Sequence, residues 1–116
     1  MSRSKVNALM VSIDPLFGFG GQRLQVVLAS RYNIPTIYGD RSDPLAGGLV
    51  SYGPNLPGTW RQAGVYVARI LKGEKTTELP VVQPTRFELI INLKTAKRLG
   101  IDISPTLLAR ADEVIE

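Results

Sequence analysis

The segment Leu49-Val50-Ser51-Tyr52-Gly53-Pro54-Asn55 decides the fold that this sequence predicts. Its first four residues are mostly apolar and favour a short strand, which the Gly53-Pro54 pair ends. Asn55 can then cap a long helix, because an asparagine side chain accepts hydrogen bonds from the free N–H groups of the first turn. The segment therefore predicts a strand that turns directly into a helix running to about Gly73.

A similar strand and helix precede this segment. Residues 6–13 are apolar and β-branched, which predicts a strand buried on both faces, and Asp14-Pro15 suits a helix start. Apolar residues then recur at helical spacing until about Tyr32, and residues 34–38 predict a second strand. Strands that alternate with helices in this way predict a parallel sheet covered by helices.

The second half of the chain continues the pattern. Residues 87–91 predict a fourth strand, and Asn92 is expected to cap a short helix that ends before Gly100. Ser104-Pro105 predicts the start of a last helix that continues to Ala111. We expect an α/β fold: a small parallel sheet of four strands, flanked by four or five helices. Residues 1–5 form a basic N-terminal arm, and residues 6–116 a single α/β unit.

Composition excludes several classes of function. The 116 residues contain no cysteine and no histidine, which removes disulfides, thiol nucleophiles, imidazole bases and the usual zinc sites. No apolar run approaches the roughly 20 residues that a membrane helix needs. The formal charge of +4 is not gathered on one aromatic-rich face, so we expect no nucleic-acid partner. We also expect no metal, no cofactor and no enzymatic activity.

A ligand site is expected where the strands end, because open α/β sheets bind ligands at the carboxyl ends of their strands. Tyr38, Tyr52 and Trp60 could form an aromatic wall there, although the helical stripe of Trp60 favours a place in the core. The polar residues at the strand ends are Asp14, Tyr38, Asp40, Ser51 and Tyr52.

Two other interpretations stay open. Residues 18–21 form a glycine-rich stretch between a strand and a helix, where an anion could bind, although the dinucleotide and P-loop motifs are absent. Asp14, with Asp40 and Asp43, could instead mark a flavodoxin-like or receiver-like module phosphorylated on Asp14. Asp14 and Asp43 also suit plain helix caps, since a proline follows each.

Several blocks of sequence together resemble one family, the substrate-binding proteins of ABC transporters with a type I periplasmic-binding fold. The blocks are residues 52–57, 69–75, 79–81, 83–85, 87–97 and 99–113, and residues 7–15, Ile34-Pro35 and Gly47-Gly48 fit the preceding segments of the family. The resemblance covers nearly the whole chain but only the carboxyl-terminal portion of the family pattern. It implies ligand-facing loops at Ile13-Asp14, at residues 38–40 and at Tyr52-Gly53.

The resemblance also implies a function and partners. The protein would bind a small organic solute, such as an amino acid, and deliver it to an ABC permease without chemistry. A chain that lacks much of the first lobe would leave sheet edges exposed, so we expect a homo-oligomer. The family resemblance implies a periplasmic location, whereas residues 1–14 lack an export signal and the chain as written would be cytoplasmic. A ligand-free homodimeric assembly module is the remaining alternative.

Overall fold

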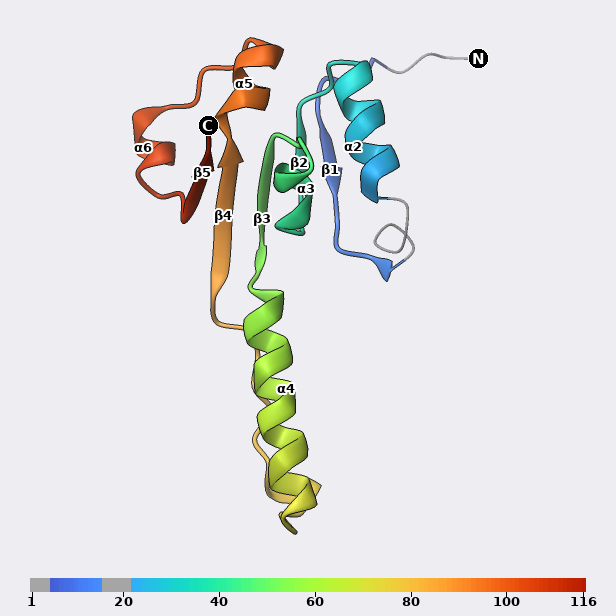
Figure 1. Ribbon diagram of the computed structural model, residues 1–116, viewed down its shortest axis with the longest axis vertical. Coiled ribbons are helices and arrows are strands. Elements are labelled where there is room, and N and C mark those ends of the chain that lie inside the picture. The colour runs from blue at the N-terminus through green and yellow to red at the C-terminus, as the bar shows by residue number, and fades with distance from the viewer. Residues whose placement is uncertain (1–4, 16–21) are drawn as a thin grey trace. The chain divides into compact units, whose positions relative to one another are not determined.

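The computed structural model describes residues 5–15 and 22–116 (Figure 1). Two compact units divide the chain: Met1–Gly53 with Glu88–Glu116, here called the sheet unit, and Pro54–Phe87, here called the hairpin unit. None of the helices in the described ranges combines the length and the apolar character that crossing a membrane requires.

The elements follow each other in chain order. The strands are β1 (Leu9–Val11), β2 (Thr36–Tyr38), β3 (Val50–Pro54), β4 (Phe87–Asn92) and β5 (Glu113–Ile115). The helices are α2 (Gln22–Arg31), α3 (Ser42–Leu45), α4 (Leu56–Leu71), α5 (Leu93–Leu99) and α6 (Pro105–Leu108), with a 3₁₀ turn at Thr76–Glu78.

The strands form one sheet in the order β1-β2-β3-β4-β5. The ladders β1–β2, β2–β3 and β4–β5 are parallel, and helices flank them, which confirms the predicted fold class. The chain direction reverses between β3 and β4, as two hydrogen bonds show. At the end of β4, Asn92 N–H donates to the carbonyl of Leu49, just before β3 (2.8 Å). Just after β3, Asn55 N–H donates to the carbonyl of Arg86, just before β4 (3.1 Å). The amino ends of β4 and β5 therefore lie at the same edge as the carboxyl ends of β1 to β3.

Local capping signals are confirmed at three helices. The side-chain oxygen of Asn55 accepts from Gly58 N–H (2.6 Å), that of Asn92 from Thr95 N–H (3.0 Å), and that of Ser104 from Leu107 N–H (3.3 Å). Gly100 follows α5 in the left-handed region, at φ 68°, which only glycine adopts without a steric penalty. These helix ends follow from nearest-neighbour chemistry, so the sequence was sufficient to predict them.

Two predictions about the strands are wrong. The segment over residues 6–13 is not a strand buried on both faces: only Leu9–Val11 is a strand, and Met10 is 78% exposed. A fifth strand, β5, follows α6, which ends at Leu108 rather than continuing to Ala111. This strand of three residues forms because β4 accepts it: Asp112 N–H donates to the Leu89 carbonyl, and Leu89 N–H to the Asp112 carboxylate, both at 2.8 Å.

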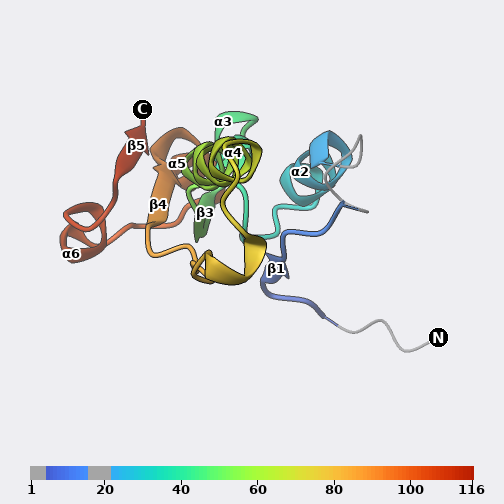
Figure 2. The same cartoon turned by 90° about the horizontal axis from the view of Figure 1, so that it is seen from below.

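The core of the sheet unit lies between the sheet and the helices on one of its faces. Figure 2 shows α2, α3 and α5 on one side of the sheet and α6 on the other. Two buried polar side chains tie α5 to the turn after α3: Asn92 Nδ2 donates to the Pro44 carbonyl and Thr95 Oγ1 to the Gly47 carbonyl, both at 2.9 Å. The buried apolar residues are Val26, Ala29, Tyr38, Leu49, Ile90, Ile91 and Ala96.

The hairpin unit consists of α4 and the extended segment that returns along it. Tyr66 Oη donates to the Pro80 carbonyl at 2.6 Å, which fastens the returning segment to the helix. No residue of α4 is buried, and Trp60 is 73% exposed. The expectation that Trp60 belongs to the core is therefore wrong, because the apolar stripe of α4 finds too little apolar surface within its own unit.

Candidate functional site

The site that the sequence predicts lies in the sheet unit, at one edge of the sheet. We define the strand-end edge as Ile13-Asp14 after β1, residues 39–41 after β2, Tyr52-Gly53 in β3, Glu88 in β4 and Glu113 in β5. Parallel pairing brings the first three groups to this edge, and the reversal at β4 adds the two glutamates. Figure 1 shows how the ends of β1 to β3 share this edge.

The main chain is tightly packed at this edge. A β-carbon on Gly53 would overlap the carbonyl oxygen of Gly39, and one on Gly39 would lie 2.5 Å from Ile13 Cγ1. Gly39 N–H also donates to the Val11 carbonyl at 3.0 Å, which extends the β1–β2 ladder past its last paired residues. The loops after β1 and β2 and the end of β3 are therefore held together by backbone contacts.

Asp40 is fixed by a local turn. Its Oδ1 accepts from Ser42 N–H at 2.8 Å and from Ser42 Oγ at 2.5 Å. An aspartate side chain that accepts a hydrogen bond from the backbone two residues ahead orders a loop locally, without any contact to a distant part of the chain. The predicted cap by Asp43 is wrong, because α3 begins at Ser42 without a side-chain cap and Asp43 lies inside it.

Asp43 is a buried carboxyl group, 6% exposed, behind this loop. Burial, and to a smaller extent the neighbouring charge of Asp40, raises the pKa of Asp43 to about 6. Burial also raises the pKa of Tyr38, although its hydrogen bond with Thr36 acts in the opposite direction. The chain thus holds two titratable groups of the sheet unit in surroundings that disfavour their charged forms.

Arg41 forms an ion-pair cluster with two glutamates that are far away in the sequence. Its guanidinium lies 2.9 Å from Glu113 Oε2 and 3.3 Å from Glu88 Oε2. The cluster links the loop after β2 to the amino ends of β4 and β5. Sequence reasoning missed these three residues, because no local motif joins positions separated by 47 and 72 residues.

The predicted site residues differ in how accessible they are. Asp14 is exposed, Asp40 is half-buried, and the Tyr52 side chain is 55% exposed. Tyr38 and Ser51, which are paired across β2 and β3, are only 2% and 1% exposed. The ring of Tyr38 lies against Gly48, where a β-carbon would approach to 2.7 Å. Tyr38 and Ser51 are thus buried, whereas Asp14, Asp40 and Tyr52 are at least partly accessible.

Three further predictions concern an anion site at the glycine-rich stretch, a helix cap by Asp14 and a metal site. The glycine-rich stretch at residues 18–21 and the residues that Asp14 would cap lie outside the described residues. In the described ranges, no three acidic side chains gather in a way that could hold a metal ion.

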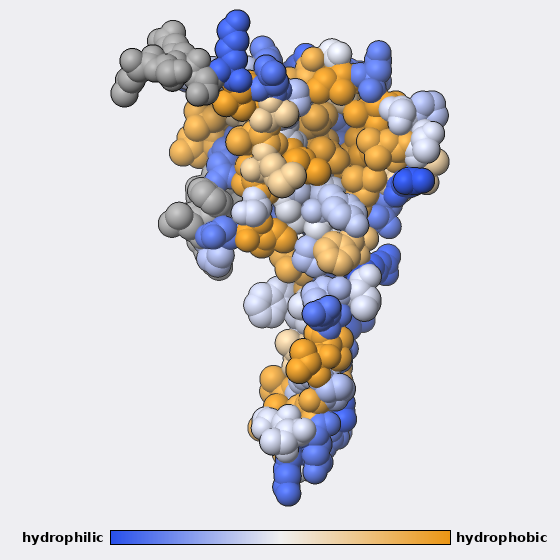
Figure 3. Space-filling view, turned by 180° about the vertical axis from the view of Figure 1, so that it is seen from behind, coloured by the Kyte–Doolittle hydropathy of each residue, from blue (hydrophilic) through white to orange (hydrophobic). Residues whose placement is uncertain are grey.

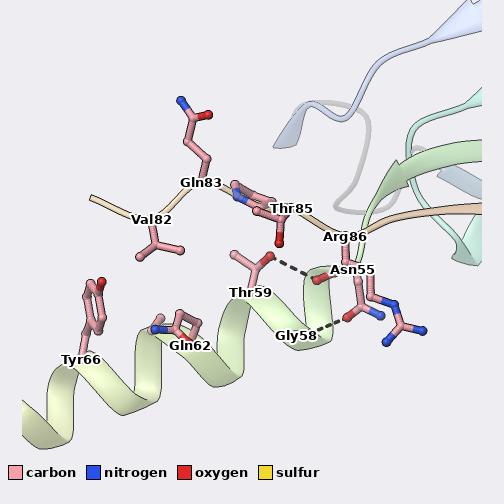
Figure 4. Close-up of a pocket in the computed structure, with 11 residues that line it drawn as sticks. Asn55, Gly58, Thr59, Gln62, Tyr66, Val82, Gln83, Thr85 and Arg86 are labelled. Carbon is pink, nitrogen blue, oxygen red and sulfur yellow. Dashed lines mark hydrogen bonds between the residues drawn. The ribbon is translucent and has the colours of Figure 1, made fainter. Parts of the chain in front are cut away.

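A concave surface that the sequence did not indicate lies wholly in the hairpin unit. It is a groove of about 470 Å³ between α4 and the returning segment. In Figure 4, Thr59, Gln62 and Tyr66 come from the helix, and Val82 and Thr85 lie opposite them on the returning segment. Amides, hydroxyls and apolar groups line the groove, together with the exposed side chain of Arg86.

The sheet is mixed, with three parallel ladders and one reversal, and helices flank it, which defines the molecule as an α/β protein. Comparison with known families is specific: the sequence profile described as ABC transporter substrate binding protein matches residues 1–115. The chain belongs to the ABC transporter substrate-binding protein family. No curated protein matches the chain.

Solved structures agree with this assignment. An ABC domain from Streptococcus pneumonia in complex with L-Trp superposes with a TM-score of 0.87 at 29% identity, covering 96% of this chain and 37% of that one. A conserved domain protein from Vibrio cholerae superposes with a TM-score of 0.85 at 28% identity, covering 93% of this chain and 36% of that one.

A ligand-free, open substrate-binding protein with adhesive properties from Clostridium difficile shares the fold. Its TM-score is 0.61 at 23% identity, and the match covers 93% of this chain and 36% of that one. The chain spans little more than a third of each of these relatives.

Proposed function

We propose that this chain binds a small organic solute, such as an amino acid, as part of the substrate-binding component of an ABC transporter. The observation that carries the proposal is the family match over residues 1–115, together with the L-Trp complex of a structure that superposes at a TM-score of 0.87. The proposed role is binding and delivery to a permease without catalysis.

The strand-end edge suits a solute that carries an ammonium group. Asp14 and Asp40 supply carboxylates there. The hydrogen bond from Ser42 N–H to Oδ1 holds the Asp40 carboxylate in one orientation. The ring of Tyr52 adds an accessible aromatic face, which attracts both cations and flat apolar groups. The nearby guanidinium of Arg41 contacts Glu88 and Glu113, so this edge carries an excess of negative charge.

The remaining site residues support this surface in the proposal. Tyr38 and Ser51 are buried, so we assign them to the layer that holds the loops in position rather than to direct solute contact. Gly53 lets the end of β3 approach Gly39, and its main chain can then come close to a solute. The relatives are longer, so a complete cleft would need surfaces beyond this chain, from a longer polypeptide or from a partner copy.

The partners and the location follow the family. We propose an ABC permease as the receiving partner and a periplasmic or extracellular site of action, as the family match supports. We also propose that the chain corresponds to the carboxyl-terminal portion of the family's substrate-binding proteins.

Thermal unfolding of the chain in the presence of each amino acid tests the function directly. Binding to the folded state alone raises the midpoint in proportion to the logarithm of ligand concentration. We expect one or a few amino acids to raise it, and Tyr52→Ala and Asp40→Asn to weaken that binding by about tenfold each, corresponding to about 1.4 kcal/mol.

Tyr32 provides a matched control, because it is also an exposed tyrosine, at 66%, but follows α2 instead of a strand end. Tyr32→Ala should bind the same amino acid as the unchanged chain. If Tyr32→Ala and Tyr52→Ala behave alike, the strand-end edge is not the site. If no amino acid raises the midpoint at millimolar concentration, the chain does not bind amino acids on its own.

A further inference from the structure

Arg41 connects the loop after β2 to the other half of the sheet. Within that loop, the Asp40 carboxylate accepts hydrogen bonds from Ser42 N–H and Ser42 Oγ, so these two residues bond to each other. α3 begins at Ser42 without a side-chain cap that would fix its first turn. The two ion pairs of Arg41, by contrast, extend to Glu88 in β4 and to Glu113 in β5. The side chain next to Asp40 thus anchors its loop to two distant strands.

The two glutamates lie on the same face of adjacent strands. Glu113 pairs with Ile90 in the parallel ladder of β4 and β5, and Ile90 is two residues from Glu88. Because side chains alternate along a strand, all three point to the same side of the sheet. Like charges so close on one face destabilise a sheet. The guanidinium of Arg41 contacts both carboxylates, so one positive charge compensates two neighbouring negative charges.

The depth of Glu88 gives this bridge its weight. The Glu88 side chain is 11% exposed, against 42% for Glu113 and 39% for Arg41. A carboxylate that is largely removed from water needs an opposite charge or hydrogen bonds, and Arg41 supplies both at 3.3 Å. Figure 3 shows hydrophobic side chains gathered over large parts of one face of the sheet unit, so charged contacts are confined to the remaining surface. Both ion pairs join residues of this one unit.

We propose that Arg41 is a positioning residue for the solute site: its bridge to Glu88 and Glu113 holds the Asp40 carboxylate at the strand-end edge. The effect on solute affinity rests on the function proposed above, whereas the effect on the loop does not. The sign of the change separates positioning from a simple charge effect. Removal of the positive charge makes this edge more negative, which by itself strengthens the binding of an ammonium group. Loss of a positioning contact weakens that binding instead.

Amide hydrogen exchange of the chain without any solute tests the effect on the loop. Ser42 N–H is the reporter, because it donates to Asp40 Oδ1. In Arg41→Gln we expect this amide to exchange about fivefold faster, the factor that partly exposed ion pairs can supply. Gly39 N–H, which donates to the Val11 carbonyl, should be affected less. An unchanged rate at Ser42, or an equal acceleration of the two amides, would overturn the proposal.

Variants of the glutamates test whether Arg41 acts through them. Glu88→Gln combined with Glu113→Gln should accelerate exchange at Ser42 as much as Arg41→Gln does, and all three changes together should add nothing further. Arg69→Gln is the matched control, because the ion pair of Arg69 lies in the hairpin unit at a similar exposure, 41%. It should leave the exchange rate of Ser42 unchanged. Additive effects of Arg41 and the glutamates would contradict the bridge.

Calorimetric titration with the amino acid that most raises the unfolding midpoint tests the effect on the site. We expect Arg41→Gln to weaken its binding about fivefold. Equal or tighter binding by this variant would refute the positioning role, since that is the result that charge alone predicts. If no amino acid binds the unchanged chain, the proposed function fails, and the exchange rates still decide whether Arg41 holds the loop.

Discussion

The carbonyl oxygen of Gly39 lies where a β-carbon on Gly53 would have to be placed. This close approach joins the loop after β2 to the end of β3, two of the three groups that the sequence assigned to the ligand site. Both residues follow or end short strands, and the contact needs the absence of a side chain at Gly53. The geometry of the strand-end edge thus requires glycine at position 53, because any β-carbon there would meet the Gly39 carbonyl oxygen.

Gly53→Ala should therefore destabilise the chain by about 1–3 kcal/mol, because an added methyl group must displace main-chain atoms. Gly64→Ala is the matched control, since a β-carbon at Gly64 in α4 would meet no atom within 4 Å. Alanine there should stabilise the helix by about 0.5–1 kcal/mol. Urea unfolding followed by circular dichroism measures both, and equal stability of the two variants would contradict the contact.

The two asparagine caps should respond differently to the same change. Asn92 is 5% exposed, and its Nδ2 donates to the Pro44 carbonyl, so Asn92→Asp would lose the donor and bury a carboxylate beside an acceptor. We expect a loss of about 1–3 kcal/mol. Asn55→Asp keeps the acceptor that α4 uses and adds a negative charge at a helix amino end, so it should be neutral or slightly stabilising. Chemical denaturation at pH 7 distinguishes the two, and a similar loss in both would contradict the burial of Asn92.

Asp43 should make stability depend on pH between about 4 and 6. Its pKa is about 6 in the folded chain and 3.8 as a free group, so the unfolded state loses its proton first as the pH rises. The free energy of unfolding should accordingly fall as the pH rises through that window. Each unit of difference between the two pKa values corresponds to about 1.4 kcal/mol, so the fall is at most about 3 kcal/mol. Asp43→Asn should remove this fall, and unfolding midpoints at pH 4, 5, 6 and 7 measure it. An unchanged profile in the variant would assign the dependence to other groups.

Arg41→Gln should destabilise the sheet unit modestly, by about 1 kcal/mol, because the two ion pairs that it breaks are partly exposed. The effect should shrink in 1 M salt, which screens charges at this depth. Arg69→Gln is a comparison of similar exposure: Arg69 pairs with Glu74 at 2.7 Å and lies over the Tyr66 ring, so its loss should also cost at most about 1 kcal/mol. A cost at Arg41 that is independent of salt would point to packing instead of charge.

The sequence by itself determined the features that neighbouring residues control. Asn55, Asn92, Ser104 and Gly100 specify helix ends, because each bond joins groups at most a few positions apart. The alternation of helices with the first three strands follows from apolar periodicity along the chain, and the family from the resemblance of several sequence blocks taken together.

Only the tertiary structure decided which side chains are covered. The apolar runs of β1 and α4 predicted burial, yet Met10 and Trp60 are exposed, because burial requires a facing surface that the run itself does not contain. β5 exists because β4 offers it hydrogen-bond partners, and Arg41 finds Glu88 and Glu113 only after the chain reverses between β3 and β4. At the strand-end edge, sequence indicated the residue types, and long-range packing placed Tyr38 and Ser51 beneath the surface while it left Tyr52 accessible.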